Sequence, residues 1–453
     1  MSNWLLYVAS ALLLLVSSTA VESGGAGGDT HALLINTLLS NYSKYTRPVI
    51  NATTTTVVSH RILPIQILDV DEKNQIITLK VWLALRWYDE FLTWNPSDFG
   101  GINVVNIPVD LIWQPDIYLY GSTSKDFVRH LDTDVQIYPD GLIIAPQPVI
   151  YKSTCEIDAT FFPFDQQECY LKFGSWTYDG FRIDLDIYPN SGKLDNYIAN
   201  GEWHLFEIPI VKHVAFYICC IEPYPDITYT LIFQRRSLFY FYTLVIPAIL
   251  LFVLVLVGFY LPSNCGERMT LFVTSMLALI VFLTLVSEYM PPTSNSTPYL
   301  QRYLLSMIGF VSAASVLTGI NINIHFQAPG CPPIPRWLQN VAFNYLAVIA
   351  CMRGRVKTYL KHQIEAMSEN EYSGNKEIEA SHGTIDDAEH VRQKSLILQA
   401  DNISYNYRVQ GWQLLAQILD RILLICFLLA FVSISVGMFT FLYTQKKGPS
   451  HAH

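Results

Sequence analysis

The sequence predicts an all-β sandwich of the immunoglobulin-like kind, followed by an all-α domain of four membrane-spanning helices. Short runs rich in Ile, Val, Tyr and Trp fill residues 57–235 and are separated by Asp-Gly, Pro-Asp and Asn-Pro pairs, which is typical of an antiparallel sandwich of about ten strands. Four long apolar segments follow, and 51% of the 453 residues are hydrophobic. The net charge of -9, with few clusters of basic residues, argues against a nucleic acid partner.

The amino-terminal region reads as a targeting segment followed by an exported domain. The first 20 residues, MSNWLLYVASALLLLVSSTA, have the apolar run and small-residue ending of a secretory signal peptide, although no Lys or Arg precedes the run. We therefore expect residues 21–237 to be extracellular, with a short helix over residues 31–45. Asn41 and Asn51 begin Asn-x-Ser or Asn-x-Thr patterns there and are expected glycan acceptors, whereas Asn402 is expected to be cytoplasmic and unmodified.

Each of the four apolar segments is long enough to cross a bilayer; they are Leu238–Leu261, Gly266–Glu288, Tyr299–Phe326 and Arg421–Tyr443. The predicted organisation is helices one to three in residues 238–326, a cytoplasmic loop with an amphipathic helix in 327–418, a fourth span in 419–443 and an extracellular tail in 444–453. Basic residues gather after the third segment, which places that side in the cytoplasm and both chain ends outside the cell.

One face of the second apolar segment carries the ionisable and hydroxyl side chains that a lipid-facing helix would avoid. At about 1.5 Å per residue, the 21 steps between its two glutamates span roughly 30 Å, so the glutamates lie at the two ends of the hydrocarbon core. The residues of this face are spaced by three or four positions: Glu267, Thr270, Thr274, Leu277, Val281, Leu285 and Glu288. Two explanations stay open on this stretch alone. The face lines a water-filled path, or it is buried in a helix bundle with its polar groups paired internally.

The eight cysteines fall into two groups. Those of the exported half are expected to be paired, because disulfides persist outside the cell, and they are Cys155, Cys169, Cys219 and Cys220. Those in or beside the apolar segments are expected to be free, and they are Cys265, Cys331, Cys351 and Cys426. Adjacent cysteines rarely bond to each other, so position alone favours separate partners for Cys219 and Cys220. No P-loop, GxSxG or HExxH motif occurs, so we expect no enzyme activity, no metal and no other cofactor.

The segment CEIDATFFPFDQQEC places thirteen residues between Cys155 and Cys169, around the core Phe162-Pro163-Phe164-Asp165. In isolation such a pair would be a disulfide that stabilises a loop, with no function implied. With its aromatic-Pro-aromatic-Asp core the segment resembles the hallmark of the Cys-loop family of pentameric ligand-gated ion channels. The resemblance runs from about residue 35 to the carboxyl end, apart from the cytoplasmic loop. It implies a Cys155–Cys169 disulfide, a pentameric assembly in the plasma membrane at synapses, and gating by an extracellular ligand.

Cys219 and Cys220 resemble the vicinal disulfide at the tip of the agonist-capping loop in nicotinic alpha-type subunits, and the resemblance implies that they pair with each other. The other walls of the family's agonist box are implied by motif: Tyr217 and Tyr224 beside the cysteines, Trp176 in GSWTY, Tyr120 in WQPDIYLY and Trp82 in VWLALRW. Aromatic faces attract a desolvated ammonium by about 2 kcal/mol or more. The alternative is that these rings belong to the core, the role that we assign to Trp87, Trp94 and Trp113.

Both faces of the box are implied within one chain, Trp82 on one and the cysteine loop on the other, so we expect a homopentamer, with a heteropentamer as an alternative. The stretch Leu142–Gln147, LIIAPQ, departs from the nicotinic pattern, because it is aliphatic and is followed by Pro148. A cationic or amphiphilic agonist is therefore expected rather than acetylcholine itself. Two further alternatives are a binding subunit that conducts only with a partner and an adhesion receptor with a non-conducting anchor.

The resemblance also implies a relay from the binding domain to the membrane. Its members would be Glu72, Asp165, Arg235 or Arg236, and Pro298 in the loop after the second apolar segment. For any one of these charges the alternative is a surface ion pair worth less than about 1 kcal/mol.

In a pentamer the face of the second apolar segment would become a set of rings. Glu267 at the inner mouth and Glu288 at the outer mouth would concentrate cations, while Leu277 and Val281 would form a constriction that closes by dewetting. Thr270 and Thr274 would line the inner half. Anion-selective relatives carry a Pro-Ala insertion before the basic residue that stands here as Arg268, and this chain has Gly-Glu instead, so the resemblance implies cation selectivity.

Overall fold

The computed structural model describes the backbone of residues 26–123, 133–218, 220–263, 265–290, 297–326, 332–365 and 387–446, and the side chains in these ranges apart from residues 26–29, 387–404 and 442–446. The predicted signal peptide, residues 1–20, lies outside the described residues. The chain divides into two compact units. One consists of the residues up to Ile157 with Gln166–Arg235, and the other of Asp158–Asp165 with the residues from Arg236 onward.

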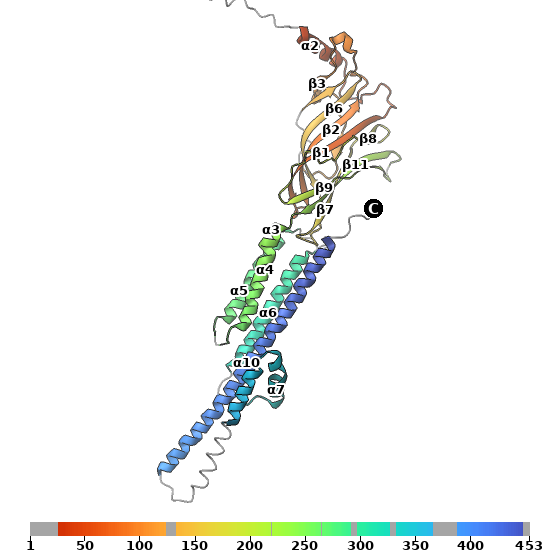
Figure 1. The fold of residues 1–453 in the computed structure, drawn as a ribbon. Helices are drawn as coiled ribbons and strands as arrows, with labels where there is room; N and C mark the ends of the chain where they lie inside the picture. The colour runs from red at the N-terminus through yellow and green to blue at the C-terminus, as the bar shows by residue number, and fades with distance from the viewer. Residues whose placement is uncertain are drawn as a thin grey trace, which may run out of the picture. The chain divides into compact units, whose positions relative to one another are not determined.

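The first unit contains a helix and eleven strands in its described residues (Figure 1). Helix α2, Ala26–Leu39, starts and ends earlier than the helix expected over residues 31–45. The strands are β1 Thr56–Asp71, β2 Ile76–Tyr88, β3 Val105–Pro108, β4 Ile117–Leu119, β5 Asp134–Ile137, β6 Leu142–Thr154, β7 Gln166–Ser175, β8 Ile183–Ile187, β9 Trp203–Glu207, β10 Ile210–Phe216 and β11 Pro223–Arg235. Two short 3-10 helices, η1 Pro96–Phe99 and η2 Val109–Leu111, lie between β2 and β4.

The strands form the two layers of a sandwich. One sheet has the order β3-β5-β6-β2-β1-β8 and the other β10-β11-β7-β4, with β9 paired to β11. Among the described residues, every pair of strands in the sheets is antiparallel except β1 with β8. The predicted immunoglobulin-like sandwich is confirmed.

Alternating side chains of both sheets fill the core of the first unit. In β2 the buried positions Ile77, Leu79, Val81 and Leu83 alternate with positions that face outward, as the two-residue period of a strand requires. Trp87 lies in this core, with its ring edge-on to that of Trp113 at 6.3 Å, and Trp94 packs half-buried against it. The structural role predicted for these three tryptophans is confirmed.

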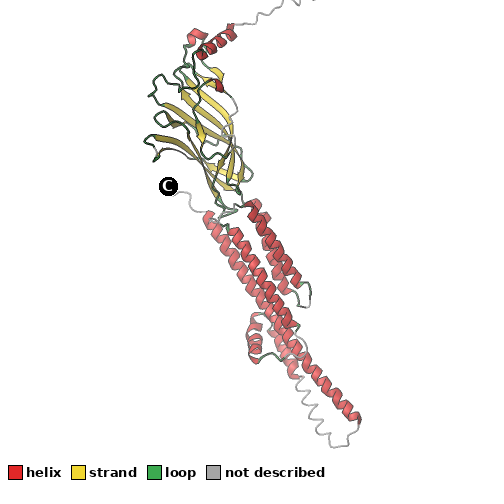
Figure 2. Ribbon diagram, turned by 180° about the vertical axis from the view of Figure 1, so that it is seen from behind, coloured by secondary structure: helices red, strands yellow, loops and turns green. Residues whose placement is uncertain are grey.

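The second unit is helical (Figure 2). Its elements are α3 Leu238–Tyr240, the π-helical η3 Phe241–Val245, α4 Ile246–Tyr260, α5 Arg268–Tyr289, α6 Tyr299–His325, α7 Arg336–Asn340, the π-helical η4 Val341–Leu346, α8 Ala347–Ile349 and α10 Asp387–Lys446. Residues 353–365 are also helical. Four helices are long and apolar enough to cross a membrane, Leu238–Tyr260, Arg268–Tyr289, Tyr299–His325 and Tyr405–Phe441. The predicted four-helix membrane domain is confirmed.

Aromatic rings and one glycine set the packing of the four long helices. Phe252 of α4 stacks on Phe431 of α10 at 4.4 Å, and Phe259 lies 5.2 Å from Phe427. A Cβ on Gly258 would lie 2.7 Å from the ring of Phe272, so only glycine lets α4 and α5 approach this closely. Helix α10 runs unbroken from Asp387 to Lys446, so the helix expected in the loop and the fourth span are one continuous helix.

Candidate functional site

The five-stranded sheet brings four of the predicted binding aromatics into two ring pairs. Tyr120 follows β4 and lies 6.0 Å from Trp176, which follows β7. Tyr217 follows β10 and lies 5.5 Å from Tyr224 of β11. The pairs are neighbours, because β7 lies between β4 and β11 and pairs Gly174 with Asp226, two residues after Tyr224. Burial, followed by the nearby Tyr217, Asp226 and Asp116, raises the pKa of Tyr120 to about 12. Four rings from four elements therefore gather at one end of this sheet.

Exposure separates the predicted binding tryptophans from the core ones. Trp176 is 67% exposed and Trp82 is 50% exposed, whereas Trp87 is 1% exposed. Trp82 belongs to β2 of the six-stranded sheet, where it stands opposite Leu63 of β1 and Pro148 of β6. Among the described residues, no ring contact joins Trp82 to the other four aromatics. A box that used all five rings would therefore need Trp82 from a second copy of the chain or from a partner subunit.

Asp116 holds the segment that carries Trp176, and the sequence reasoning missed it. Its carboxylate accepts hydrogen bonds from the Ser175 hydroxyl at 2.6 Å and from the backbone N–H and hydroxyl of Thr177 at 2.8 and 2.6 Å. Its backbone carbonyl accepts the N–H of Trp176 at 3.3 Å. The signal available in the sequence was the Pro-Asp pair of WQPD, which we read only as a turn.

Two glycines permit close approaches around the rings. A Cβ on Gly174 would lie 2.1 Å from the hydroxyl of Tyr120, so this ring can cross β7 only at a glycine. The hydroxyl of Tyr120 donates to the carbonyl of Ser175 at 3.0 Å. Gly180 donates its N–H to the carbonyl of Pro223 at 2.7 Å, which ties the segment after Trp176 to the start of β11.

Asp226, Lys172 and His213 form a charged cluster next to the rings, which the sequence reasoning also missed. Asp226 of β11 is buried and lies 3.0 Å from the Lys172 ammonium and 3.4 Å from the His213 ring. The same ammonium lies 5.8 Å from the centre of the Tyr120 ring. Lys172 and Asp226 are 54 positions apart in the sequence, and β7 and β11 bring them together only because they are hydrogen-bonded neighbours.

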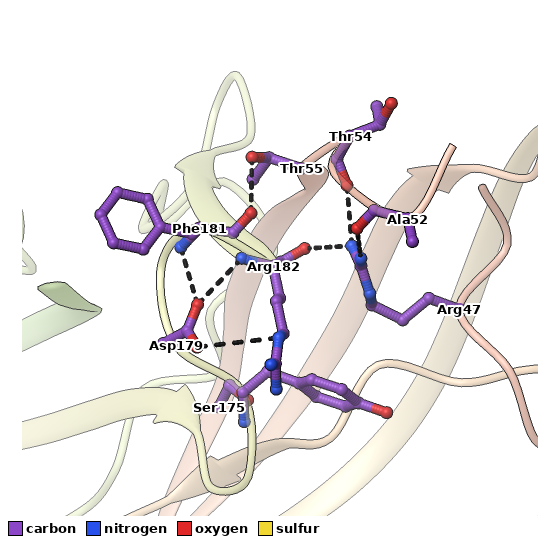
Figure 3. A network of polar contacts seen from close by, with 9 residues as sticks. Arg47, Ala52, Thr54, Thr55, Ser175, Asp179, Phe181 and Arg182 are labelled. Atoms are coloured by element: carbon purple, nitrogen blue, oxygen red, sulfur yellow. Dashed lines mark hydrogen bonds and ion pairs between the residues drawn. The ribbon is translucent and has the colours of Figure 1, made fainter. Parts of the chain in front are cut away.

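A network of carbonyl contacts fixes the far side of the Trp176 segment (Figure 3). Arg47 donates from Nη1 to the carbonyls of Thr54 and Arg182 at 2.8 and 2.9 Å, and from Nη2 to that of Ala52 at 2.6 Å. Asp179 accepts the N–H groups of Phe181 and Arg182 at 3.0 and 3.1 Å. The segment from Trp176 onward is thus held to the loop that carries Asn51.

The predicted disulfides and glycan acceptors can be placed in part. Cys155 and Cys169 form the predicted disulfide, with their Cα atoms 5.1 Å apart. Cys220 is disulfide-bonded, and Cys219 lies outside the described residues. The predicted free cysteines Cys265, Cys351 and Cys426 are free, and Cys331 lies outside the described residues. Asn41 and Asn51 are both exposed.

Of the two arginines offered for the relay, the structure pairs Arg235 with Glu72. Nη1 of Arg235 lies 2.8 Å from Glu72 and 2.9 Å from Glu202, and its guanidinium stacks on the ring of Trp203 at 4.1 Å. Arg236 is exposed. Burial raises the pKa of Glu72, while Arg235 acts in the opposite direction. Glu202 and Trp203 were not foreseen.

The remaining relay candidates lie in the second unit. Asp165 is 2% exposed, and Pro298 is buried directly before α6. The segment Asp158–Asp165 packs within the same unit. There the carbonyl of Thr160 accepts the N–H of Tyr299 at 3.0 Å, and the ring of Phe162 lies 5.0 Å from that of Tyr240.

All seven residues of the predicted polar face are exposed in the single chain. Leu277, Val281 and Leu285 are 61%, 50% and 39% exposed, and Glu267, Thr270, Thr274 and Glu288 are exposed as well. The opposite face of α5 is buried against the chain's own helices through Phe272, Ser275, Leu279 and Val286. The alternative of a face buried in this chain's bundle is therefore wrong for the described residues. Helix α5 begins at Arg268, with Glu267 as its preceding residue.

A buried ion pair anchors the start of α5. Arg268 is 0% exposed, and its two terminal nitrogens lie 2.9 and 2.5 Å from the two carboxylate oxygens of Asp420 in α10. Asn321 of α6 donates to the same carboxylate at 2.5 Å, and Ser263 donates to it at 3.4 Å. Three helices and the α4–α5 turn therefore meet at Asp420. In the described residues, no group of three or more His, Cys, Asp or Glu side chains could hold a metal.

Known proteins match both units. The model described as the neurotransmitter-gated ion-channel ligand binding domain matches residues 31–237, and that described as the transmembrane region of these channels matches residues 244–406. The neuronal acetylcholine receptor subunit alpha-9 of Gallus gallus is 40% identical over 348 residues, which is 77% of this chain and 70% of that protein. The alpha-2 subunit of Pan troglodytes is 42% identical over 324 residues, 71% of this chain and 61% of that protein. The human alpha-9 subunit is 39% identical over 344 residues, 76% of this chain and 70% of that protein.

Proposed function

Because the chain belongs to the neurotransmitter-gated, Cys-loop family of ion channels, on its nicotinic acetylcholine receptor-like side, we propose that it is a subunit of a cation channel opened by a small extracellular agonist. One observation carries the proposal. Trp176, a large apolar ring, is 67% exposed yet held by Asp116 beside Tyr120, with Tyr217 and Tyr224 next to it. Indole and phenol faces arranged in this way attract a desolvated ammonium.

The site is completed between subunits. Trp82 lies on the six-stranded sheet and the other four rings lie at the five-stranded sheet, so a neighbouring copy that presents its Trp82 would close the box. One chain carries both faces, which favours a homopentamer in the plasma membrane over a heteropentamer. Both chain ends are then extracellular, the signal peptide is removed, and Asn41 and Asn51 carry glycans.

Agonist binding would be relayed by the charged group around Arg235. Its guanidinium ties Glu72, in the turn after β1, to the end of β11, which leads directly into the membrane helices. Asp165 and Pro298 would receive the motion in the second unit. Closing the loop from Tyr217 to Tyr224 over the agonist would rotate the sandwich and tilt the pore helices apart.

The exposed face of α5 would line the pore. Rings of Glu267 and Glu288 would concentrate cations at the two mouths, and Leu277 with Val281 would form the gate. The hydroxyls and carboxylates along this exposed face would be costly to bury in lipid, whereas water in a pore would solvate them.

The side chains around Trp82, on the face of the box opposite the cysteine loop, favour a second candidate for the agonist. Pro146 and Pro148 are exposed on β6, and Pro148 stands directly opposite Trp82. These side chains offer no hydrogen bonds to the polar end of a ligand. An amphiphilic cation with an apolar tail therefore fits this wall better than acetylcholine does. The remaining alternative, a subunit that conducts only with partners, would use the same site.

Expressing this chain alone and recording currents under a panel of amines and amphiphilic cations tests the proposal. Trp176→Ala should abolish the response at unchanged surface expression and assembly. Phe206→Ala, an exposed aromatic on β9 of the same unit, is the matched control and should respond normally. Normal activation of the Trp176 variant would refute the aromatic site. If the chain expressed alone gives no current and conducts only with a partner subunit, the heteropentamer is favoured.

A further inference from the structure

The outward face of the six-stranded sheet carries two arginines on the side of Trp82 toward the end of β2. Side chains on one face of a strand recur at every second residue, so Trp82, Ala84 and Arg86 share a face. Arg61 of β1 stands opposite Ala84, and Leu63 stands opposite Trp82. One side-chain position, about 7 Å along the sheet, therefore separates the Trp82 pair from the Arg61 pair.

Both arginines converge on one aromatic ring. The guanidinium of Arg61 lies 4.6 Å from the centre of the Tyr188 ring, and that of Arg86 lies 5.9 Å from it. Tyr188 follows β8 and is fixed to β1, because its N–H donates to the carbonyl of His60 at 3.1 Å. Its own carbonyl accepts the hydroxyl of Ser191 at 2.8 Å. Two positive charges thus meet at a ring whose backbone is held in place.

The carboxylates of this chain do not neutralise the two arginines. Within the ranges that the structure describes, no carboxylate lies within ion-pair distance of either guanidinium, and Nε of Arg61 has no hydrogen-bond partner. The acidic residue of β8 on the same face is Asp186, which stands beside Ser59. Asp184, two residues earlier, is bound by the Lys212 ammonium at 2.8 Å. Two guanidiniums face one carboxylate, so the patch keeps a positive charge.

The surface between Trp82 and the arginines is apolar. On β6, Pro148 stands opposite Trp82 and Pro146 stands opposite Ala84. On β1, Leu63 flanks the same path. These side chains have no hydrogen-bonding groups. A ligand whose ammonium lies against Trp82 therefore passes an apolar stretch before it reaches the positive patch.

We propose that the agonist is a zwitterion, whose ammonium occupies the aromatic box and whose carboxylate, beyond an apolar spacer, binds Arg61 and Arg86. The inference rests on the proposed function, in which Trp82 of one copy completes the box of its neighbour. Guanidinium forks match the geometry of a carboxylate, and a guanidinium stacked on Tyr188 by its flat face keeps its edge N–H groups for a ligand. The two arginines then select the negatively charged end of the agonist, which acetylcholine lacks.

A matched pair of agonists tests the proposal on the full-length chain expressed alone. One is ω-trimethylammonio-hexanoate, and the other is the corresponding carboxamide, which has the same ammonium and spacer but a neutral end. The acid should open the parent channel at a concentration about tenfold lower than the amide. Arg61→Gln and Arg86→Gln should each raise the half-maximal concentration of the acid about tenfold and leave that of the amide unchanged.

Lys80→Gln is the matched control. Lys80 is an exposed cation on the same face of β2, two residues before Trp82, so its replacement removes one positive charge on the side away from the arginines. Both dose-response curves should stay unchanged. Equal shifts for acid and amide in the arginine variants, an equal shift in Lys80→Gln, or an acid no stronger than the amide on the parent would overturn the proposal. If Arg61→Gln does not reach the cell surface, Arg86→Gln carries the test.

Failure of this inference and failure of the proposed function give different results. If Trp176→Ala loses the response to both ligands while the arginine variants keep the selectivity of the parent, the aromatic site stands and the carboxylate subsite is wrong. Where no current flows, competition of acid and amide for radiolabelled acid on the purified full-length receptor measures the same selectivity. Equal affinity of the two ligands there would overturn the subsite without reference to gating.

Discussion

Because Arg235 is shared by two carboxylates, we expect its replacement to cost much more stability than the replacement of one carboxylate. Its side chain is 1% exposed and neutralises the carboxylates of Glu72 and Glu202 through bonds of 2.8 and 2.9 Å. Arg235→Gln removes the cation that the two carboxylates share and should cost about 3–5 kcal/mol of stability, as breaking the largely buried pair with Glu72 does. Glu72→Gln keeps the bond from Arg235 to Glu202 and should cost about 1 kcal/mol. Burial raises the pKa of Glu72 even beside Arg235, so its charge adds little net stability.

The double variant makes the argument sharper. Adding Glu72→Gln to Arg235→Gln removes the charge of the more buried of the two carboxylates, so the double variant should regain about 1–3 kcal/mol over Arg235→Gln alone. Unfolding of the full-length chain in detergent, followed by tryptophan fluorescence, measures these differences, because Trp203 lies under the guanidinium. Arg236→Gln, on the adjacent exposed residue, should stay within about 0.5 kcal/mol of the parent. Equal costs for the two single variants, or additive costs in the double one, would refute the reasoning.

Three further predictions concern the core, the aromatic site and the pore. Complete burial lowers the pKa of His60 from 6.5 to about 3, so the unfolded chain takes up a proton below pH 6.5 that the folded chain refuses. Between about pH 7.5 and 5 the parent should lose about 2 kcal/mol more unfolding free energy than His60→Asn, and equal slopes would contradict this. Gly174→Ala places a Cβ against the Tyr120 hydroxyl and should raise the half-maximal agonist concentration at least about tenfold at unchanged surface expression; an unmoved dose-response curve would exclude Tyr120 from the site. Glu267→Ala should weaken the cation preference measured from reversal potentials. A reversal potential of the parent channel that shifts with the chloride concentration and not with the sodium concentration would refute cation selectivity.

Spacing alone predicted which side of α5 is exposed. The seven residues of that face were chosen by steps of three and four, and all seven are exposed, with Phe272 and Leu279 on the buried side. A helix has a fixed period, so a contrast between hydroxyl and large apolar side chains is enough to orient it. What the spacing could not decide was whether the face met protein or water, because that depends on the other helices.

The choice between Arg235 and Arg236 was left open although the sequence contained the answer. In β11 the residues Leu231, Phe233 and Arg235 are buried, whereas Arg236 is exposed. Because side chains alternate between faces along a strand, the run of buried odd-numbered residues points to Arg235.

Other site residues depend on contacts that no local pattern reveals. Asp420 lies 152 positions from Arg268, and Asp116 lies 59 positions from Ser175. In the sequence, nothing distinguishes Asp420 or Asp116 from the other acidic residues. The sheet order and the helix packing bring these pairs together, and neither can be derived from the periodicity of a single segment.

The Arg268–Asp420 pair gives the exposed face of α5 its direction. A buried ion pair adds little stability by itself, and its value lies in admitting one arrangement of the parts that it joins. An α-helix turns about 100° per residue, so with Arg268 fixed on α10 the nine steps to Leu277 place that side chain about 180° away, on the far side of α5. The same geometry returns Val286, eighteen steps on, to the buried side, where it is found at 0% exposure. Asp420 therefore orients, from another helix, the face of α5 that is proposed to line the pore, and its replacement by Asn should loosen the rotation of α5 before it unfolds the bundle.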